Sequence, residues 1–270
     1  MSEPAARRSK WTLQDVDSVP PEPGELPESA LMPIAESKPI RGLDAADLDV
    51  VYQPIVDLQH GKLLAYEALV RCKVQALKDP MALFQQAVSE RACGRLGRRI
   101  REVALARCSA APLFVNVHPA ELSARWMVMP DDPLFFHEPA LYLEITESAA
   151  FTHYNLCIDV LKEVCSRSGA HLVVDDLGAG YSNLKRIVDL EPRFVKLDRT
   201  LVAGLDQHKR QRALVSHVVR LCVDLGARVV AEGIETIDEL KAARDCGAHY
   251  GQGYLLARPS FPPPAVTFPD

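Results

Sequence analysis

Long hydrophobic runs are missing from this chain of 270 residues. No apolar stretch reaches the roughly 18 residues of a membrane-spanning helix, and the N-terminus has no apolar core of the kind found in signal peptides. An excess of positive charge is missing as well, because the net charge is −5 and the isoelectric point is about 5.9. We therefore expect no membrane span and no nucleic acid bound through a basic surface.

Paired cysteines are also missing. The seven cysteines are odd in number and scattered, and no two of them form a CxxC motif. This pattern is typical of buried thiols in a reducing compartment and does not fit a disulfide framework. We therefore expect a cytoplasmic protein.

The first 45 residues lack a sustained apolar periodicity and carry seven prolines among Ser, Glu and Asp. Such a segment cannot bury enough surface to offset the entropy lost on ordering. We expect residues 1–45 to be a flexible, disordered arm, which is either an unstructured leader or a segment that binds a protein partner. We expect one globular domain over residues 46–262 and a C-terminal tail over residues 263–270, because Pro262-Pro263-Pro264 interrupts the pattern.

Between these ends, short apolar runs alternate with helix-like segments. The runs cover residues 63–71, 113–119, 141–148, 171–180, 193–199, 228–235 and 249–254. Runs of this kind predict buried strands, and most of them deliver an acidic residue, an amide or a lysine at or near the C-terminal end. Because a β/α barrel gathers its strand ends into one mouth, we expect an α/β fold of the TIM type with its site at that mouth.

The predicted helices lie near residues 153–168, 182–190, 206–225 and 236–246, and in a long stretch over residues 80–108 that is broken near Gly94 to Gly97. Glycines at positions 169, 226 and 247 occupy the expected C-caps. Residues 50–58 and 62–70 flank His60-Gly61 and predict a β-hairpin. The arginines at positions 91, 95, 98, 99 and 101 are interpreted as a solvated helix face.

The polar residues at the strand ends point to a metal site. Acidic side chains that converge on one mouth repel each other unless cations bind between them. The alternative for each single residue is a helix cap, since a carboxylate at the end of a strand often caps the helix that follows. Neither Cys nor His is among the candidates, so a hard cation such as Mg²⁺ or Mn²⁺ is favoured over zinc.

These residues also fall into ordered motifs. In chain order they are Gln53-Pro54-Ile55, Glu67-Ala68-Leu69 with Arg71, Asn116, Glu144-Ile145-Thr146-Glu147, Asp175-Asp176, Gly178 to Ser182, Lys196-Leu197-Asp198, Ala231-Glu232-Gly233 and Gln252-Gly253-Tyr254. Over roughly residues 48–260 the chain resembles the EAL-domain phosphodiesterases of cyclic di-GMP. The resemblance implies a modified TIM-type (β/α)8 barrel with one antiparallel strand. It also implies hydrolysis of cyclic di-GMP to linear pGpG with two Mg²⁺ or Mn²⁺ ions, in a homodimer.

The same resemblance assigns roles to individual residues. The metal ligands would be Glu67, Asn116, Glu144, Asp175 and Asp176. Lys196 would contact the attacking water or the phosphate, Glu232 would be a general base or a further metal ligand, and Glu67 would take part in catalysis. Gln53, Arg71 and Gln252 would bind substrate, and Glu147 would anchor the loop that follows Asp175.

Several of these roles have plainer alternatives. Lys196 lies within an apolar strand and could form a structural ion pair, and Glu147 could be a favourable charge at a helix N-terminus. Gln53 and Gln252 could make ordinary hydrogen bonds within the barrel. Arg71 follows Glu67 by four residues, which places both side chains on one strand face, and its guanidinium suits a phosphate.

The loop after Asp175 departs from the common family form DDFGTGYSSL, because Leu177, Ala179 and Asn183 replace Phe, Thr and Ser. These changes bear on the catalytic rate and on dimer coupling more than on metal binding. The competing function is a receptor that binds cyclic di-GMP without cleaving it. Because every predicted metal ligand is present, the sequence favours the enzyme.

Overall fold

The computed structural model describes residues 38–122, 125–146, 153–179 and 184–269. Contacts divide the chain into two units, residues 1–36 and residues 37–270. The second unit contains the barrel, and the structural statements below concern its described residues.

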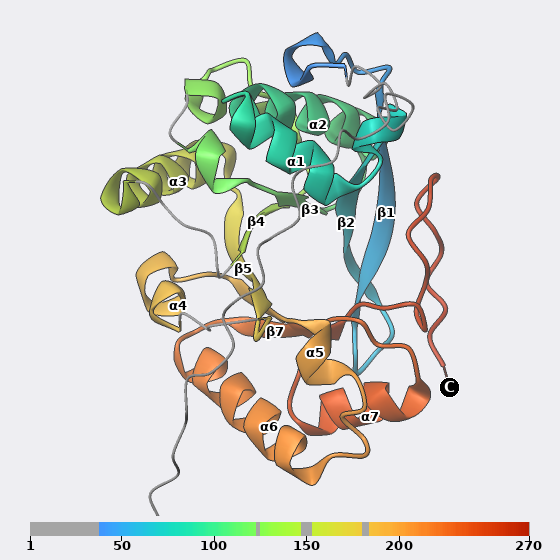
Figure 1. Cartoon of the computed structure of the whole chain (residues 1–270). Coiled ribbons are helices and arrows are strands. Elements are labelled where there is room, and N and C mark those ends of the chain that lie inside the picture. The colour runs from blue at the N-terminus through green and yellow to red at the C-terminus, as the bar shows by residue number, and fades with distance from the viewer. Residues whose placement is uncertain (1–37, 123–124, 147–152, 180–183, 270) are drawn as a thin grey trace, which may run out of the picture. The chain divides into compact units, whose positions relative to one another are not determined.

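Eight strands close into a barrel in chain order (Figure 1). They are β1 Leu48–Asp57, β2 Leu63–Cys72, β3 Leu113–Asn116, β4 Leu141–Thr146, β5 His171–Leu177, β6 Phe194–Leu197, β7 Arg228–Ala231 and β8 Tyr250–Gly251. Strand β1 runs antiparallel to both of its neighbours, β2 and β8, while the other pairs are parallel. The predicted barrel with one antiparallel strand is confirmed, as is the hairpin that joins β1 to β2.

Helices cover the outside of this barrel. They are α1 Pro80–Ser89, α2 Cys93–Arg107, α3 Tyr154–Ser168, α4 Lys185–Leu190, α5 Arg199–Val202, α6 Lys209–Asp224 and α7 Ile237–Asp245. Helices α3, α4, α6 and α7 lie where the sequence predicts them, and the short α5 was not predicted. Capping fixes several starts: the Asp79 side chain accepts from the Met81 amide at α1, and Thr236 and Glu239 form a capping box at α7. Gly169, at the C-cap of α3, has a positive φ of 69° as predicted.

The break between α1 and α2 does not lie at Gly94 to Gly97, where the sequence predicts it. Arg91 adopts a positive φ of 51° between the two helices, and α2 then runs through both glycines. Position 97 in α2 requires a glycine, because a Cβ atom there would lie 1.9 Å from Glu121 Oε2. The glycine therefore permits close packing and does not end the helix.

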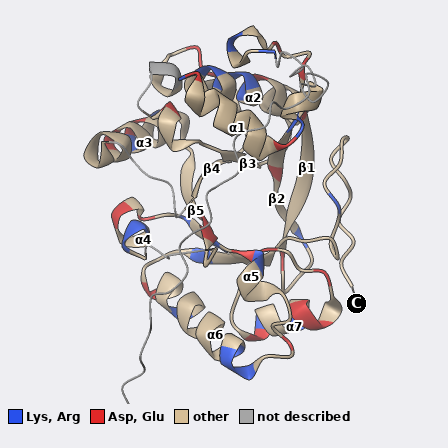
Figure 2. Cartoon of the chain, viewed as in Figure 1, with Lys and Arg blue, Asp and Glu red and all other residues tan. Residues whose placement is uncertain are grey.

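The interpretation of the arginines on this segment as a solvated face is wrong for Arg101. Its side chain is 1% exposed, and it pairs with two buried carboxylates, Glu121 and Asp132. Arg98 and Arg99 form ion pairs nearer the surface, and Figure 2 shows the basic residues along α2. The sequence does not reveal these ion pairs, because both partners of Arg101 lie far along the chain, in a connection with no helical periodicity.

One end of the barrel interior is closed by apolar side chains. Strands β2, β5 and β7 contribute Ala65, Val173 and Val230, and the rings of Phe114, Tyr142, Phe194 and Tyr250 pack among them together with Ile55. The Phe114 and Tyr142 rings stack with centroids 4.4 Å apart, and the Phe194 ring meets Tyr142 edge-on at 5.2 Å. This apolar plug leaves only the opposite end of the barrel interior for polar groups.

Packing extends beyond the predicted limits of the globular domain at both ends. Ile40 and Leu43 are 2% and 3% exposed, although the arm was predicted to reach residue 45. Past residue 262, Val266 and Phe268 pack against the main core, and the Tyr66 hydroxyl donates to the Pro264 carbonyl over 3.1 Å. The tail runs beside β1 (Figure 1).

Within the described part of the chain, no helix is long and apolar enough to cross a membrane.

Candidate active site at the barrel mouth

A ring of polar side chains lies directly above the apolar plug. On each strand the polar residue stands two positions from a plug residue, so both face the interior. The pairs are Ile55 with Gln53, Ala65 with Glu67, Phe114 with Asn116, Tyr142 with Glu144, Val173 with Asp175, Phe194 with Lys196, Val230 with Glu232, and Tyr250 with Gln252. Each strand, or in β7 and β8 the residue that directly follows it, thus contributes one residue to the ring, and all eight were predicted from the sequence.

Lys196 connects the acidic members of the ring. Its ammonium lies 2.6 Å from Glu232 Oε1, 2.7 Å from Glu144 Oε1, 3.2 Å from Asp175 Oδ1 and 3.5 Å from Glu67 Oε2. The side chain is only 1% exposed, so these carboxylates replace the solvation that the ammonium loses on burial. A structural ion pair, the plainer alternative, therefore describes part of what Lys196 does.

The amide side chains orient Glu67. Asn116 Nδ2 donates to Glu67 Oε1 over 3.3 Å, and Gln252 Nε2 donates to Glu67 Oε2. Gln252 also reaches Gln53 Oε1 at 3.1 Å, and Gln53 in turn donates to the Ala257 carbonyl. The contacts to Glu67 use the amide NH₂ groups of Asn116 and Gln252, so the carbonyl oxygens of these two side chains take no part in them.

Burial and crowding shift the acid equilibria of the ring. Burial, reinforced by neighbouring carboxylates, raises the pKa of Glu144 well above its usual value and raises the pKa of Asp175. The same causes raise the pKa of Asp176 to about 6 and that of Glu232 to about 8. Burial alone would lower the pKa of Lys196, but the surrounding carboxylates raise it, so the ammonium stays charged.

The carboxylates form two overlapping groups that could each hold a cation. Oxygen atoms of Glu67, Glu144 and Asp175 lie within 4.8 Å of one another, and so do those of Asp175, Asp176 and Glu232. Both oxygens of Glu144 are buried: Oε1 lies 2.7 Å from the Lys196 ammonium, whereas Oε2 has no hydrogen-bond partner among the described residues. A buried carboxylate oxygen without a hydrogen bond, in a group of five carboxylates, fits a divalent cation bound by oxygen ligands.

Asp176 has an unusual backbone conformation at the end of β5. Its φ is 60°, in the left-handed region, which Asp tolerates better than most residues. The pairing of β5 with β6 shifts register between Val174 and Leu177, so the usual alternation of side chains is interrupted. Leu177, one of the departures from the family form, consequently lies in the outer core and is 2% exposed. Strained backbone of this kind is concentrated at functional sites.

Among the other predicted site residues, Asp176 directly follows the ring residue Asp175, whereas Arg71 lies away from the ring. Arg71 lies on β2 opposite Asp49, beyond the part of β2 that pairs with β3, and its guanidinium donates to the Val70 carbonyl. Among the described residues it forms no ion pair with the carboxylates of the ring. Glu147 and Asn183 lie outside the described residues.

A cleft of about 240 Å³ opens beside the ring and adds residues that the sequence analysis did not assign. Its lining includes the ring residues Gln53, Glu67, Glu232 and Gln252, together with Arg199, Glu235 and Tyr254. Arg199 and Glu235 are joined by an ion pair of 2.8 Å, and the Arg258 guanidinium lies 4.2 Å above the Tyr254 ring. Arg199 directly follows the motif that ends at Asp198, and Glu235 lies two residues after the motif that ends at Gly233, which is the signal that could have revealed them.

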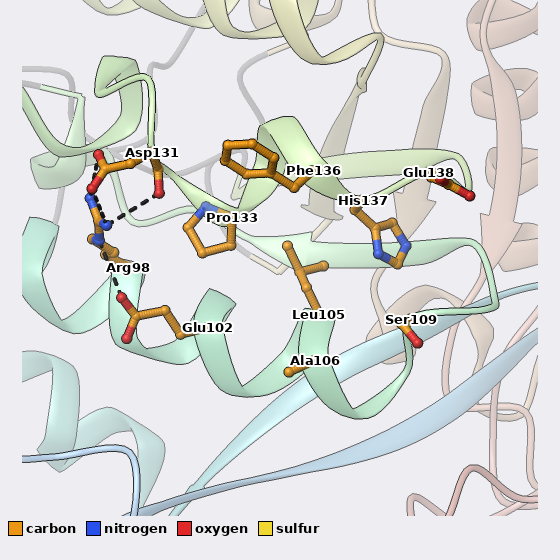
Figure 3. A pocket seen from close by; sticks show the side chains of 10 residues that line it. All are labelled: Arg98, Glu102, Leu105, Ala106, Ser109, Asp131, Pro133, Phe136, His137 and Glu138. Carbon is orange, nitrogen blue, oxygen red and sulfur yellow. Dashed lines mark hydrogen bonds and ion pairs between the residues drawn. The ribbon is translucent and has the colours of Figure 1, made fainter.

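A larger depression of about 640 Å³ lies elsewhere, between α2 and the 3₁₀ helix η6 Pro133–Phe136 (Figure 3). It contains no residue of the polar ring. Volume alone therefore does not identify the site, and the convergence of buried charge at the mouth does.

The sequence matches a family model described as the EAL domain over residues 22–259. Cyclic di-GMP phosphodiesterase RocR of Pseudomonas aeruginosa is 31% identical over 244 residues, which cover 82% of this chain and 59% of RocR. Cyclic di-GMP phosphodiesterase PA2567 of the same organism is 31% identical over 234 residues, which cover 79% of this chain and 38% of PA2567. The chain thus spans little more than half of RocR and less of PA2567.

Solved structures are similar as well. The Klebsiella pneumoniae BlrP1 complex with calcium and cyclic di-GMP has a TM-score of 0.68 at 29% identity, covering 79% of this chain and 56% of that one. The complex of PaMucR phosphodiesterase with cyclic di-GMP has a TM-score of 0.69 at 27% identity, covering 80% of this chain and 92% of that one. Because the family model matches most of the sequence, this chain belongs to the EAL domain family.

Proposed function

We propose that this protein is a metal-dependent phosphodiesterase that hydrolyses cyclic di-GMP to linear pGpG. The observation that carries the proposal is the pair of overlapping carboxylate groups at the barrel mouth, which share Asp175. Membership of the EAL family and the cyclic di-GMP phosphodiesterases among the relatives support the choice of substrate.

Glu67, Asn116, Glu144, Asp175 and Asp176 would hold two Mg²⁺ or Mn²⁺ ions. Their oxygen donors suit hard cations, and manganese accompanies cyclic di-GMP in a BlrP1 complex. When bound, such ions supply Lewis acidity to a water molecule and to the phosphate.

The remaining residues of the ring would orient the reactants. Lys196 is held at the centre by the carboxylates and offers a positive charge to the phosphate or to the attacking water. Glu232, whose pKa is raised to about 8, is suited to accept a proton near neutral pH, while its place in the second carboxylate group also suits a metal ligand. Both roles of Glu232 remain part of the proposal.

Gln53 and Gln252 would bind the substrate where the cleft meets the ring. Arg71 would bind a phosphate once its side chain releases the Val70 carbonyl. It lies four residues after Glu67 on the same face of β2, and its guanidinium suits a phosphate. Glu147 is retained as the proposed anchor of the loop after Asp175.

We also propose that the protein forms a homodimer in the cytoplasm. Apolar side chains are exposed beside and on α4, where Leu184 and Val188 are 41% and 55% exposed, and on α6, where Leu214 is 53% exposed. Exposed apolar groups on neighbouring helices support an association surface. All seven cysteines are free, which supports a reducing compartment.

The direct test is incubation of the purified protein with cyclic di-GMP and Mg²⁺ or Mn²⁺, followed by chromatographic separation of the nucleotides. The proposal predicts pGpG in the presence of metal and none with EDTA. Metal-dependent binding of cyclic di-GMP without any product would instead identify a receptor.

A further inference from the structure

The connection between β3 and β4 begins immediately after Asn116 and is fastened to α2 by two arginines. Arg98 reaches Asp131 at 2.7 Å near the surface (Figure 3). One turn further along α2, Arg101 reaches Glu121 at 2.7 Å and Asp132 at 2.9 Å. The two contacts differ in burial, because Arg101, Glu121 and Asp132 are each at most 1% exposed.

Glu121 uses both carboxylate oxygens. Oε2 accepts from Arg101, and Oε1 accepts from the backbone N–H of His118 over 2.9 Å. This second bond closes the turn at the start of the 3₁₀ helix η4 Pro119–Glu121, two residues after Asn116. The absence of a side chain at Gly97 of α2 makes room for this carboxylate, since a Cβ atom there would lie 1.9 Å from Oε2. The turn that follows Asn116 is thereby fixed to α2 through a single buried carboxylate.

Asn116 depends on such support more than the other residues of the ring. It is the last residue of β3, and its side chain is exposed. Among the described residues its amide makes one side-chain hydrogen bond, the bond of 3.3 Å to Glu67. The direction of its carbonyl oxygen is therefore set mainly by the backbone, which the adjoining turn holds in place.

Stability alone does not account for the buried triad. Replacing buried ion pairs by apolar residues of similar volume is often neutral or stabilising. A fixed position for the chain just beyond a ligand gives the triad a second role, in the way that outer contacts orient metal ligands in other proteins.

We propose that Glu121, held by Arg101, is a positioning residue for Asn116 and sets the affinity of the site for divalent cations. The inference rests on the proposed function, because it takes Asn116 as a metal ligand. Asp132 has no such role, although it shares Arg101 and also caps a 3₁₀ helix through the Leu134 amide.

Asp132 therefore provides a matched control. Glu121→Ala and Asp132→Ala each remove one buried carboxylate, one ion pair with Arg101 and one helix cap, and each leaves Arg101 with the other acid. We expect both variants to show a similar loss of melting temperature in EDTA. Only Glu121→Ala should also weaken Mn²⁺ binding, measured by titration calorimetry, by about tenfold.

Glu121→Gln should weaken Mn²⁺ binding less than Glu121→Ala does but still measurably, because its amide oxygen can accept from the His118 N–H while its ion pair with Arg101 is lost. If the alanine variants do not fold, Glu121→Gln and Asp132→Asn repeat the comparison with smaller changes, and a weaker affinity confined to the former is then expected. Equal Mn²⁺ affinities in the Glu121 and Asp132 variants would overturn the proposal.

Measuring binding and turnover separately distinguishes this inference from the proposed function. Wild-type protein that binds Mn²⁺ but leaves cyclic di-GMP intact refutes the phosphodiesterase and leaves the comparison of affinities valid. Wild-type protein that hydrolyses cyclic di-GMP, with no difference between the variants, refutes only the positioning role. Wild-type protein that binds no Mn²⁺ overturns both.

Discussion

The ammonium of Lys196 lies 2.7 Å from Oε1 of Glu144, and both side chains are at most 1% exposed. Glu144 is at the same time close to the carboxylates of Glu67 and Asp175. A single buried cation therefore stands among more negative charge than it can neutralise. This imbalance is the electrostatic basis for expecting additional cations at the barrel mouth.

Removing the ammonium should destabilise the metal-free protein. Lys196→Met leaves buried carboxylates without their counter-ion, and loss of one partner from a buried pair costs about 3–5 kcal/mol. We expect a large drop in melting temperature in EDTA and a clear recovery when Mn²⁺ is added. Lys185→Met, which removes an ion pair with a lysine 74% exposed, is the control. A Lys196→Met variant as stable as wild type in EDTA would contradict this reading of the ring.

Removing single carboxylates should abolish activity and leave the fold intact. Glu67 and Asp175 lie at the mouth, above the apolar plug that holds the barrel together. We therefore expect Glu67→Ala and Asp175→Ala to keep the secondary structure of wild type and to lose turnover by at least about 100-fold. Glu163→Ala, at an exposed position on α3, should behave as wild type. Full activity in either site variant would place the chemistry elsewhere.

Acid should destabilise the protein in part through His249. Burial, aided by Arg228, lowers the pKa of this histidine, and its Nδ1 accepts a hydrogen bond from the Val229 amide. The unfolded chain, with a histidine pKa of about 6.5, then binds the proton more readily than the folded protein. This contribution to stability is present above that pH and is lost as the pH falls below it.

Urea unfolding at pH 7.5 and pH 5.5 in EDTA measures this contribution as a difference between variants. His249→Asn keeps an acceptor for the Val229 amide but cannot take up the proton. We expect wild type to lose more stability on acidification than the variant does. An equal loss in both would show that His249 stays neutral or is equally charged in the two states.

Truncation of the N-terminus before or after residues 37–42 should give proteins with different melting temperatures. Removing residues 1–36 leaves Ile40 in its buried position, where its amide donates to Glu90 over 2.9 Å. Removing residues 1–42 deletes that side chain, and loss of a buried isoleucine typically costs 2–5 kcal/mol, so we expect a lower melting temperature for the shorter chain. Identical melting temperatures would mean that this contact contributes nothing to stability.

The polar ring could be predicted because its members follow from local patterns. Each one ends an apolar run, and the alternation of side chains along a strand places it above a plug residue. Glu67 lies in the middle of the long strand β2, but it still ranks as a strand end because the pairing of β2 with β3 stops at Ala68.

Arg101 could not be predicted in the same way. Its partners Glu121 and Asp132 lie 20 and 31 residues away along the chain, in a connection without periodicity, so nothing local distinguishes it from Arg98. For Arg71 the local pattern predicts the strand face correctly but not the position. The period of two places Arg71 on the same face of β2 as Glu67, but β2 continues beyond its pairing with β3, so Arg71 lies away from the ring. Register within a strand is readable from sequence, whereas tertiary contacts between irregular segments are not.

The most direct test of the account measures hydrolysis of cyclic di-GMP by wild type and by Asp175→Asn as Mn²⁺ is titrated into metal-free protein. Asp175 belongs to both carboxylate groups, so its neutral variant should weaken both at once with little change in shape. The account predicts that wild-type protein forms pGpG in proportion to the Mn²⁺ bound, and that Asp175→Asn forms almost none. Equal rates in the two proteins, or wild-type turnover that persists in EDTA, would contradict it.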